Sequence, residues 1–222
     1  MRYLDLLTAL FATVLLVSNV ASTKLVVLGP FTFDGGTLLF PLAYVFGDVL
    51  TEVYGYRKSR RVIWIGFFAL LLATLTFQMV AALPAPPDGE SERLGEAFRL
   101  LLGLTPRIVL GSLTAYFLGE FANAYVLAKL KVRTEGRFFW LRALTSTLVG
   151  QGLDTGVFLL VAFYGVFPEE VLLAVFLSNY AFKVGVEALM LPVTYAVVGF
   201  LKRAEGMDVY DRDTDFNPFR LT

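Results

Sequence analysis

Long apolar segments, separated by short charged stretches, run through almost the whole chain. About 20 apolar residues in a row can cross the hydrocarbon core of a bilayer as an α-helix. We predict membrane-spanning helices at about 5–28, 36–56, 62–83, 106–130, 141–167 and 169–201. Neither a domain boundary nor an internal repeat separates them. The pattern therefore predicts an all-α integral membrane protein, a single six-transmembrane-helix bundle over residues 1–222.

Two further segments differ from these spans. A proline-rich loop at 84–90 precedes residues 91–104, where apolar side chains recur at helical spacing and charged side chains lie between them. This alternation is typical of a helix in the membrane interface, so we expect a short interfacial helix between the third and fourth spans. The tail at 202–222 is polar and acidic, and we expect it to be flexible.

The composition agrees with a membrane protein and excludes several kinds of chemistry. Hydrophobic residues make up 57% of the chain and the mean hydropathy is +0.68, above the level of a soluble domain. Because cysteine and histidine are absent, the chain has no thiolate nucleophile and lacks the commonest metal ligand and general base. A formal net charge of zero argues against a nucleic-acid partner. We therefore expect no enzymatic activity, no cofactor and no metal.

Basic residues gather in the connections on one side of the predicted bundle. They follow the second, fourth and sixth spans, at 57–61, 129–142 and 202–203. The connections on the other side are mainly acidic, as at 88–96 and 169–170. Since basic connections face the cytoplasm, both termini are predicted to be cytoplasmic in a multi-pass protein of the inner (cytoplasmic) membrane.

Several ionisable side chains fall deep inside the predicted spans, where each is a functional hypothesis by default. Acids outnumber bases five to two, as Asp48, Glu52, Glu120, Asp154 and Glu187 against Lys24 and Lys183. Four amides accompany them, namely Asn19, Asn123, Gln151 and Asn179. Lys183 and Glu187 can pair within one helix, and contacts of this kind can be purely structural. The excess of acids is hard to explain in that way, because unpaired carboxylates must be protonated, face water, or bind a cationic or hydrogen-bond-donating ligand.

Four side chains of the second span lie four residues apart and share one helix face, namely Phe40, Tyr44, Asp48 and Glu52. Aromatic rings can stack on a planar ligand, and a carboxylate can accept two N–H bonds from an amino-pyrimidine edge. Core packing is the simpler interpretation for Phe40. We predict that Asp48 and Glu52 bind the ligand. Asp48 lies deeper, and Glu52 is also a candidate for gating at the inner mouth.

Two other functions fit single features of the chain. Asp154-Thr155-Gly156 spells the aspartic-protease triplet, and Gly47-Asp48 is similar to a motif of intramembrane aspartyl proteases. The first falls in mid-span, however, and the rest of the second signature is missing. A non-transport scaffold would use the polar side chains only between helices. No phosphate-binding loop is present, so the chain is not expected to hydrolyse nucleotides itself.

Five of the spans carry blocks that can be compared with known families. These blocks are Ser18–Lys24, Gly36–Tyr44 with Asp48–Gly55, Gly119–Lys131, Arg142–Thr155, and Tyr180–Glu187 with Pro192–Tyr195. Together they resemble the signature of the queuosine precursor transporters, also called the vitamin uptake transporter family. The loop after the third span has no counterpart.

The resemblance implies a six-helix membrane protein that imports 7-cyano-7-deazaguanine and/or 7-aminomethyl-7-deazaguanine through a central polar cavity. It also implies a distant likeness to vitamin-binding membrane components that work with separate energising subunits, and it leaves a homo-oligomer open. On this interpretation the amides orient the ring, and Asp154 or Glu120 binds a second edge or a coupling proton. Lys24 and Lys183 then hold acids in the ionised state.

Overall fold

The computed structural model describes residues 1–28 and 31–220, with the backbone alone for 25, 28, 31–34, 37, 40 and 41. Within these residues the chain forms seven α-helices, one 3₁₀-helix and one antiparallel strand pair. In chain order they are α1 (Leu4–Ala21), β1 (Leu25–Leu28), β2 (Phe31–Asp34), the 3₁₀-helix η1 (Gly35–Leu38), α2 (Phe40–Tyr54), α3 (Tyr56–Ala82), α4 (Glu90–Leu102), α5 (Pro106–Arg133), α6 (Phe139–Phe163) and α7 (Glu169–Glu205).

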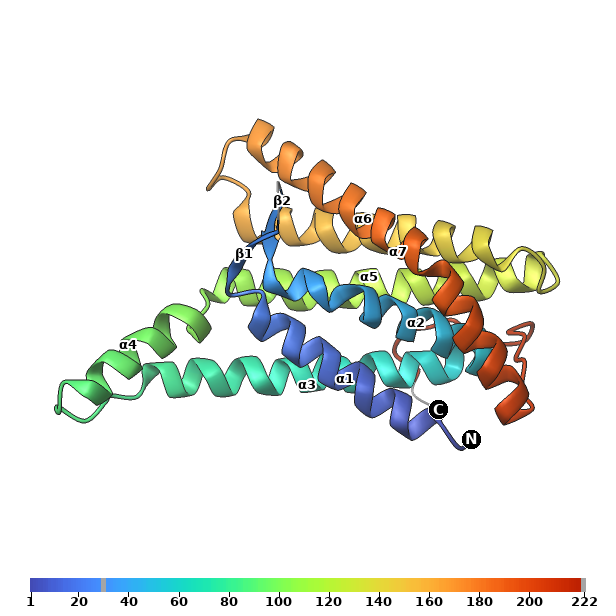
Figure 1. Ribbon diagram of the computed structural model, residues 1–222, viewed down its shortest axis with the longest axis horizontal. Coiled ribbons are helices and arrows are strands. Elements are labelled where there is room, and N and C mark those ends of the chain that lie inside the picture. The colour runs from blue at the N-terminus through green and yellow to red at the C-terminus, as the bar shows by residue number, and fades with distance from the viewer. Residues whose placement is uncertain (29–30, 221–222) are drawn as a thin grey trace.

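The helices lie lengthwise in one bundle with two different ends (Figure 1). At the basic end, α2 meets α3, α5 meets α6, and α7 ends. At the hairpin end lie the β1–β2 hairpin, α4 and the connection from α6 to α7. The N-terminus lies at the basic end, where the backbone N–H groups of Arg2 and Tyr3 donate to the Glu205 carboxylate at 2.9 and 2.7 Å.

The most extensive helix pair is α5 with α6. A Cβ atom added to Gly119 of α5 would lie 2.8 Å from the Cβ of Asp154, and one added to Gly150 of α6 would lie 2.8 Å from the Cβ of Asn123. Small residues allow membrane helices to approach this closely. The two glycines therefore fix the positions of Asn123 and Asp154 relative to each other.

The first predicted span is too long. α1 ends at Ala21, and residues 25–28 instead pair with 31–34 as antiparallel strands. The break expected at Gly29-Pro30 lies outside the described residues. A short apolar run with β-branched residues suits a strand as well as a helix. As a consequence, Lys24 follows the helix and is exposed, so the prediction of a deep cation at this position is wrong.

The second predicted span is divided between η1 and α2. α2 has 15 residues, about 22 Å at 1.5 Å per residue, which is shorter than the ~30 Å hydrocarbon core. Gly55 ends α2 and begins α3 with a φ of +81°, a conformation that glycine adopts without strain. The basic residues at 57–61 therefore begin α3 rather than forming a loop, and Arg60 is buried.

Four described helices are long and apolar enough to cross a membrane, namely α1, α3, α6 and α7. The pair α4 and α5, bent by 43° at residues 103–105, can be counted as a fifth. The protein is thus an all-helical, multi-pass membrane protein. A helix close to the predicted 91–104 is confirmed as α4, which has no buried residue.

The expectation of a flexible tail is wrong. Residues 206–220, the strap, fold back over the basic end, where Asp211 Oδ2 accepts from the backbone N–H of Tyr56 at 2.9 Å. A carboxylate is favourable at a helix N-terminus. The buried Arg60 donates to the carbonyls of Asp215 and Asn217 at 2.8 and 2.7 Å. These contacts and the ring of Phe216 packed on Tyr56 account for the ordered strap.

Candidate functional site

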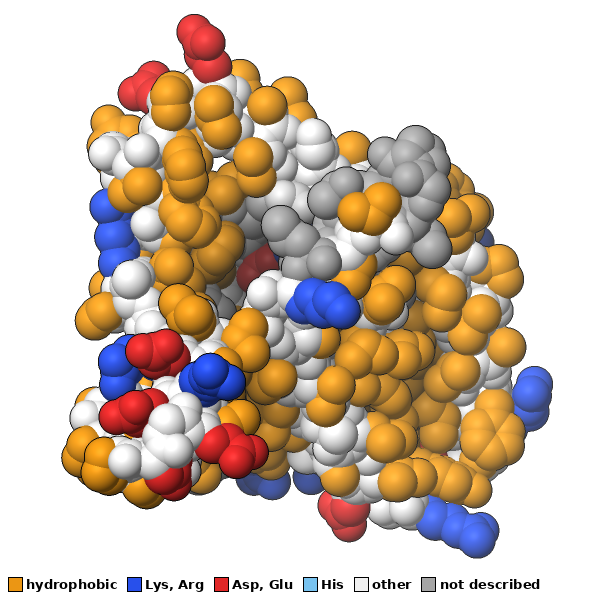
Figure 2. Space-filling model, turned by 60° about the vertical axis from the view of Figure 1, so that its left-hand side comes forward, with side chains coloured by type: hydrophobic (Ala, Val, Ile, Leu, Met, Phe, Trp, Pro, Cys, Tyr) orange, Lys and Arg blue, Asp and Glu red, His pale blue; other side chains and the backbone are white. Residues whose placement is uncertain are grey.

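A cavity of about 400 Å³ lies at the hairpin end of the bundle, and we call it the main cavity. Its walls come from the end of α1, the start of α5, the second half of α6 and the start of α7. They combine aromatic side chains with polar ones, including Asn19, Ser112, Asp154, Thr155, Phe158, Phe163, Asn179 and Lys183. Figure 2 looks toward this end and shows a hollow with an acidic side chain inside it. Its volume falls within the range of small-molecule sites.

A smaller cavity of about 50 Å³, the acid pocket, lies deeper in the bundle. It shares Leu15, Tyr116 and Asp154 with the main cavity. The other polar side chains on its wall are Tyr44, Glu120, Asn123 and Gln151. The Tyr44 hydroxyl donates to Gln151 Oε1 at 2.7 Å and joins α2 to α6. The two cavities therefore adjoin at shared wall residues, and we call them together the polar path.

Asp154 and Lys183 form an ion pair on the wall of the main cavity. Lys183 Nζ lies 2.9 Å from Asp154 Oδ2, and the side chains are 15% and 29% exposed. Lys183 also donates to the Thr155 hydroxyl at 3.4 Å. The sequence suggested a pair with Glu187 on the same helix, whereas this ion pair joins α7 to α6. It presents a cation and an anion side by side to any ligand in the cavity.

Asp48 and Glu187 lie behind the acid pocket and are only 2% and 4% exposed. Asn123 Nδ2 donates to Asp48 Oδ1 at 3.2 Å, and the Thr147 hydroxyl donates to Glu187 Oε1. The two carboxyl side chains come within hydrogen-bonding contact of each other. Glu187 Oε2 receives no hydrogen bond in the described structure. Asp48 is absent from the walls of both cavities, although the sequence ranked it first for the ligand.

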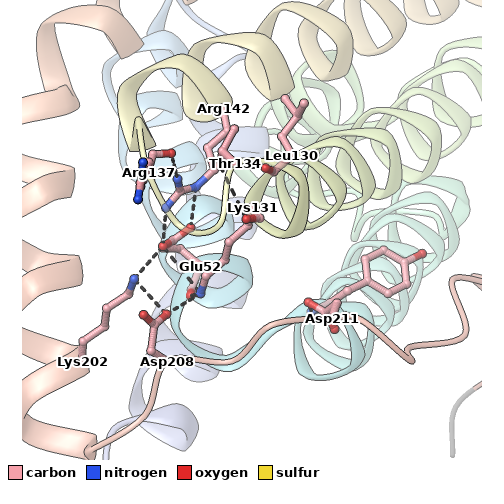
Figure 3. Close-up of polar contacts among 10 residues, drawn as sticks. Glu52, Leu130, Lys131, Thr134, Arg137, Arg142, Lys202, Asp208 and Asp211 are labelled. Carbon is pink, nitrogen blue, oxygen red and sulfur yellow. Dashed lines mark hydrogen bonds and ion pairs between the residues drawn. The ribbon is translucent and has the colours of Figure 1, made fainter.

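Glu52 lies at the basic end in a cluster of opposite charges with Lys131, Arg142, Lys202 and Asp208, the basic-end cluster (Figure 3). Its Oε1 lies 2.7 Å from Arg142 Nη2 and 2.6 Å from Lys202 Nζ, and its Oε2 accepts from Arg142 Nε at 3.0 Å. The side chains of Glu52, Arg142 and Lys131 are at most 1% exposed. A bidentate pair of this kind is geometrically specific. The cluster ties α2 to α5, α6 and α7.

Asp208 of the strap completes this cluster. It accepts from Lys131 and lies 2.9 Å from Lys202 Nζ. Partial burial favours its neutral form, but hydrogen bonds from the two lysines outweigh this and hold the pKa of Asp208 below its ordinary value. The strap is therefore bound to the basic end through an ionised carboxylate.

The structure sorts the predicted site residues into separate groups. Those on the walls of the two cavities are Asn19, Tyr44, Glu120, Asn123, Gln151, Asp154, Asn179 and Lys183. Asp48 and Glu187 lie behind them, Glu52 lies at the basic end, and Lys24 is exposed. The side chain of Phe40 lies outside the described residues.

Sequence reasoning missed the partners of Glu52. Lys131, Arg142 and Lys202 were assigned only to topology, as basic residues near helix ends. A signal for Arg142 was its place within the Arg142–Thr155 block, at the start of an otherwise apolar span. No local feature pointed to Asp208.

Comparisons with known proteins agree with this architecture. Residues 34–197 match the family described as "Putative vitamin uptake transporter". A protein of Bacillus subtilis (strain 168) named "Probable queuosine precursor transporter" is 36% identical over 84% of this chain and 80% of its own length. The "Queuosine precursor transporter" of Escherichia coli (strain K12) is 26% identical over 73% of this chain and 71% of its own length.

No solved structure matches the chain. The relatives are named as transporters rather than enzymes, which agrees with the expectation from composition. The family match covers most of the chain, and the span-length helices and polar path suit a membrane carrier. The chain therefore belongs to the vitamin uptake transporter family.

Proposed function

We propose that the protein imports a queuosine precursor, 7-cyano-7-deazaguanine or 7-aminomethyl-7-deazaguanine, across the inner membrane. The observation that carries the proposal is the main cavity. The Asp154–Lys183 ion pair lies on its wall, and Asp154 also lies on the wall of the acid pocket. Relatives with the name queuosine precursor transporter support the choice of substrate.

The ion pair complements the edge of a guanine-like base. Such an edge presents a carbonyl acceptor beside a ring N–H and an exocyclic amino group. Lys183 supplies N–H donors for the carbonyl, and Asp154 supplies two acceptor oxygens for the adjacent N–H groups. Because Asp154 lines both cavities and Asp48 lines neither, we assign the base edge to Asp154 in preference to Asp48. Asn19 and Asn179 are placed to bind the rest of the ring.

The orientation follows from the charges. We place the basic end in the cytoplasm, with six crossings formed by α1, η1 with α2, α3, α5, α6 and α7. Both termini are then cytoplasmic, and α4 lies in the outer interface. In this orientation the main cavity faces outward, and the basic-end cluster closes the path toward the cytoplasm.

Uptake of radiolabelled deazaguanines by cells unable to make them tests the proposal. Asp154→Asn and Glu120→Gln keep the shape of the cavities while removing charge. We expect each to lower the initial rate about tenfold or more, because a hydrogen bond to a charged group contributes about 1.5 to 3 kcal/mol.

The matched control is Glu92→Gln, the same chemical change on the exposed surface of α4, which should transport normally. Membrane levels of each variant are measured on the same cells. Wild-type uptake by both cavity variants at equal membrane levels would sink the assignment of the site. Lack of deazaguanine uptake by the unmodified protein would contradict the proposal that a deazaguanine is the substrate.

A further inference from the structure

Asp48 and Glu187 make a contact that neither the cavities nor the basic-end cluster explains. They come from different helices, α2 and α7, are almost fully buried, and contact each other through their carboxyl groups. An ionised carboxylate is only an acceptor of hydrogen bonds. Two carboxylates in contact therefore require a proton on one of them, which turns that group into a donor.

Among the described residues, no cation forms an ion pair with this carboxyl pair. The ionisable groups that face it are Tyr44 and Glu52 on α2, Glu120 on α5 and, next to Glu120, Asp154 on α6. Lys183 is paired with Asp154, and the cations nearest Glu52 are held by Glu52 itself. Glu187 Oε2 is buried without a hydrogen-bond partner in the described structure.

In the part of the chain that the structure describes, no group of three or more acidic side chains is arranged to hold a metal ion. A proton is small enough for a buried contact between two side chains, and it satisfies the geometry. The carboxyl pair also connects to the polar path, because Asn123 donates to Asp48 and lines the acid pocket.

We infer that Asp48 and Glu187 form a proton-binding site between α2 and α7, and that inward movement of this proton drives uptake. The step forms one O–H bond to a carboxylate with a proton from outside water, and the same bond breaks when the proton is released inside. The part of the inference that concerns uptake, namely that proton movement drives it, rests on the proposed import function. The site itself is independent of the identity of the substrate.

The two helices explain how the proton would act on the path. Glu52 follows Asp48 by one turn on α2, and Lys202 lies further along α7 toward the basic end. Glu52 and Lys202 are 2.6 Å apart, so the same two helices carry a proton-dependent contact and an ion pair. Loss of the proton leaves two negative charges facing each other. Their repulsion weakens the packing of α2 against α7, the two helices that also form the Glu52–Lys202 ion pair.

The test uses purified protein in liposomes, with the membrane potential held at zero and an imposed pH gradient, acidic outside. Uncharged 7-cyano-7-deazaguanine is the probe. One proton per substrate predicts about tenfold accumulation for each pH unit of gradient. Glu187→Gln and Asp48→Asn replace the shared proton by a permanent amide donor. We expect both to exchange labelled for unlabelled substrate but to lose the accumulation, while Glu92→Gln accumulates normally.

Infrared spectroscopy of the purified proteins provides a readout without transport. The unmodified protein at neutral pH should show a carbonyl band from protonated carboxylic acids, and each single variant should lose the part of its intensity that comes from the shared proton. Accumulation of substrate by Glu187→Gln, or accumulation driven by sodium instead of the pH gradient, overturns the coupling. A band of unchanged intensity in both variants overturns the site. Absence of any exchange by the unmodified protein refutes the import function and the coupling, and the infrared result still decides the proton site.

Discussion

Asp48 and Glu52 lie one turn apart on α2, but their surroundings differ in almost every respect. Glu52 accepts hydrogen bonds from Arg142 and Lys202, at the centre of a cluster with three cations. Asp48 contacts an amide and a second acid, Glu187, and forms no ion pair with a cation among the described residues. The basic end is thus neutralised by protein side chains, whereas the middle of the bundle retains an excess of acids.

This difference assigns two roles to two regions: the basic end closes the bundle, and the middle of the bundle binds the ligand. In this cluster each carboxylate is paired with cations of the protein itself, and the cluster holds four helices and the strap together at one end. The acidic side chains in the middle of the bundle have more acceptor oxygens than the described residues have donors for them, so a ligand can supply the missing donors. The acid pocket, as part of the polar path, lies between the main cavity and these acids. We interpret the structure as a carrier that is open at the hairpin end and closed at the basic end.

The largest expected effect comes from removing the strongest contact at the basic end. Arg142→Met preserves an unbranched, similarly long side chain but deletes the buried guanidinium that binds both oxygens of Glu52. Breaking a buried ion pair costs about 3 to 5 kcal/mol, and we expect the lower end because Lys202 remains. Thermal unfolding in detergent should show a clear decrease in the apparent Tm.

The control for this change is Arg137→Met. Arg137 is exposed, and its backbone carbonyl, rather than its side chain, accepts from Arg142. The substitution should leave the apparent Tm nearly unchanged. Equal losses from both variants would mean that the basic-end cluster does not dominate the stability of this end.

The contrast between the two acids also marks the limit of what the sequence predicts. Helical spacing correctly placed Asp48 and Glu52 on one face of α2. Their partners lie far away in sequence, however, with Arg142 at a separation of 90 residues and Lys202 at 150. Only tertiary packing decides which acid meets a cation.

The other differences between the predicted and the observed elements arise where a short stretch of sequence is compatible with more than one structure. The run at 25–28 fits a strand or a helix equally well, so the end of α1 was misplaced. The strap was expected to be flexible because it is polar, but its docking depends on particular contacts, such as Asp211 with the N-terminus of α3 and Asp208 with two lysines. Long apolar segments with helical periodicity, such as α3, α5 and α7, were located closely.

A smaller effect is expected from Asp208→Asn, which removes the only acidic partner that the strap supplies to Lys131 and Lys202 in the described structure. Asp208 is 41% exposed, and solvent screening limits the contribution to about 1 kcal/mol or less. Because its folded-state pKa is lowered, this contribution is present above the ordinary value near pH 4. It is lost as the pH falls further through the folded-state pKa.

Apparent Tm measured against pH tests this prediction. Wild type and Asp208→Asn should differ by a constant amount from neutral pH down to about pH 5, and converge below about pH 4. Asp213→Asn is the matched control on the same strap, because Asp213 is exposed. A difference that persists unchanged in acid, or that Asp213→Asn reproduces, would show that the Asp208 contacts contribute nothing specific.

The smallest expected effect is that of Lys24→Met, which is compared with Lys183→Met because the sequence treated the two lysines alike. Lys183 lines the main cavity beside Asp154, whereas Lys24 is exposed after the end of α1. Lys183→Met should lower deazaguanine uptake several-fold to about tenfold, because it removes a charged donor from the proposed base edge. Lys24→Met should leave both uptake and apparent Tm within error of wild type, since its side chain is exposed and does not lie on the wall of either cavity. Equal uptake by the two variants would contradict the assignment of the base edge to the Asp154–Lys183 pair, and a loss confined to Lys24→Met would move the entry site to the β1–β2 hairpin.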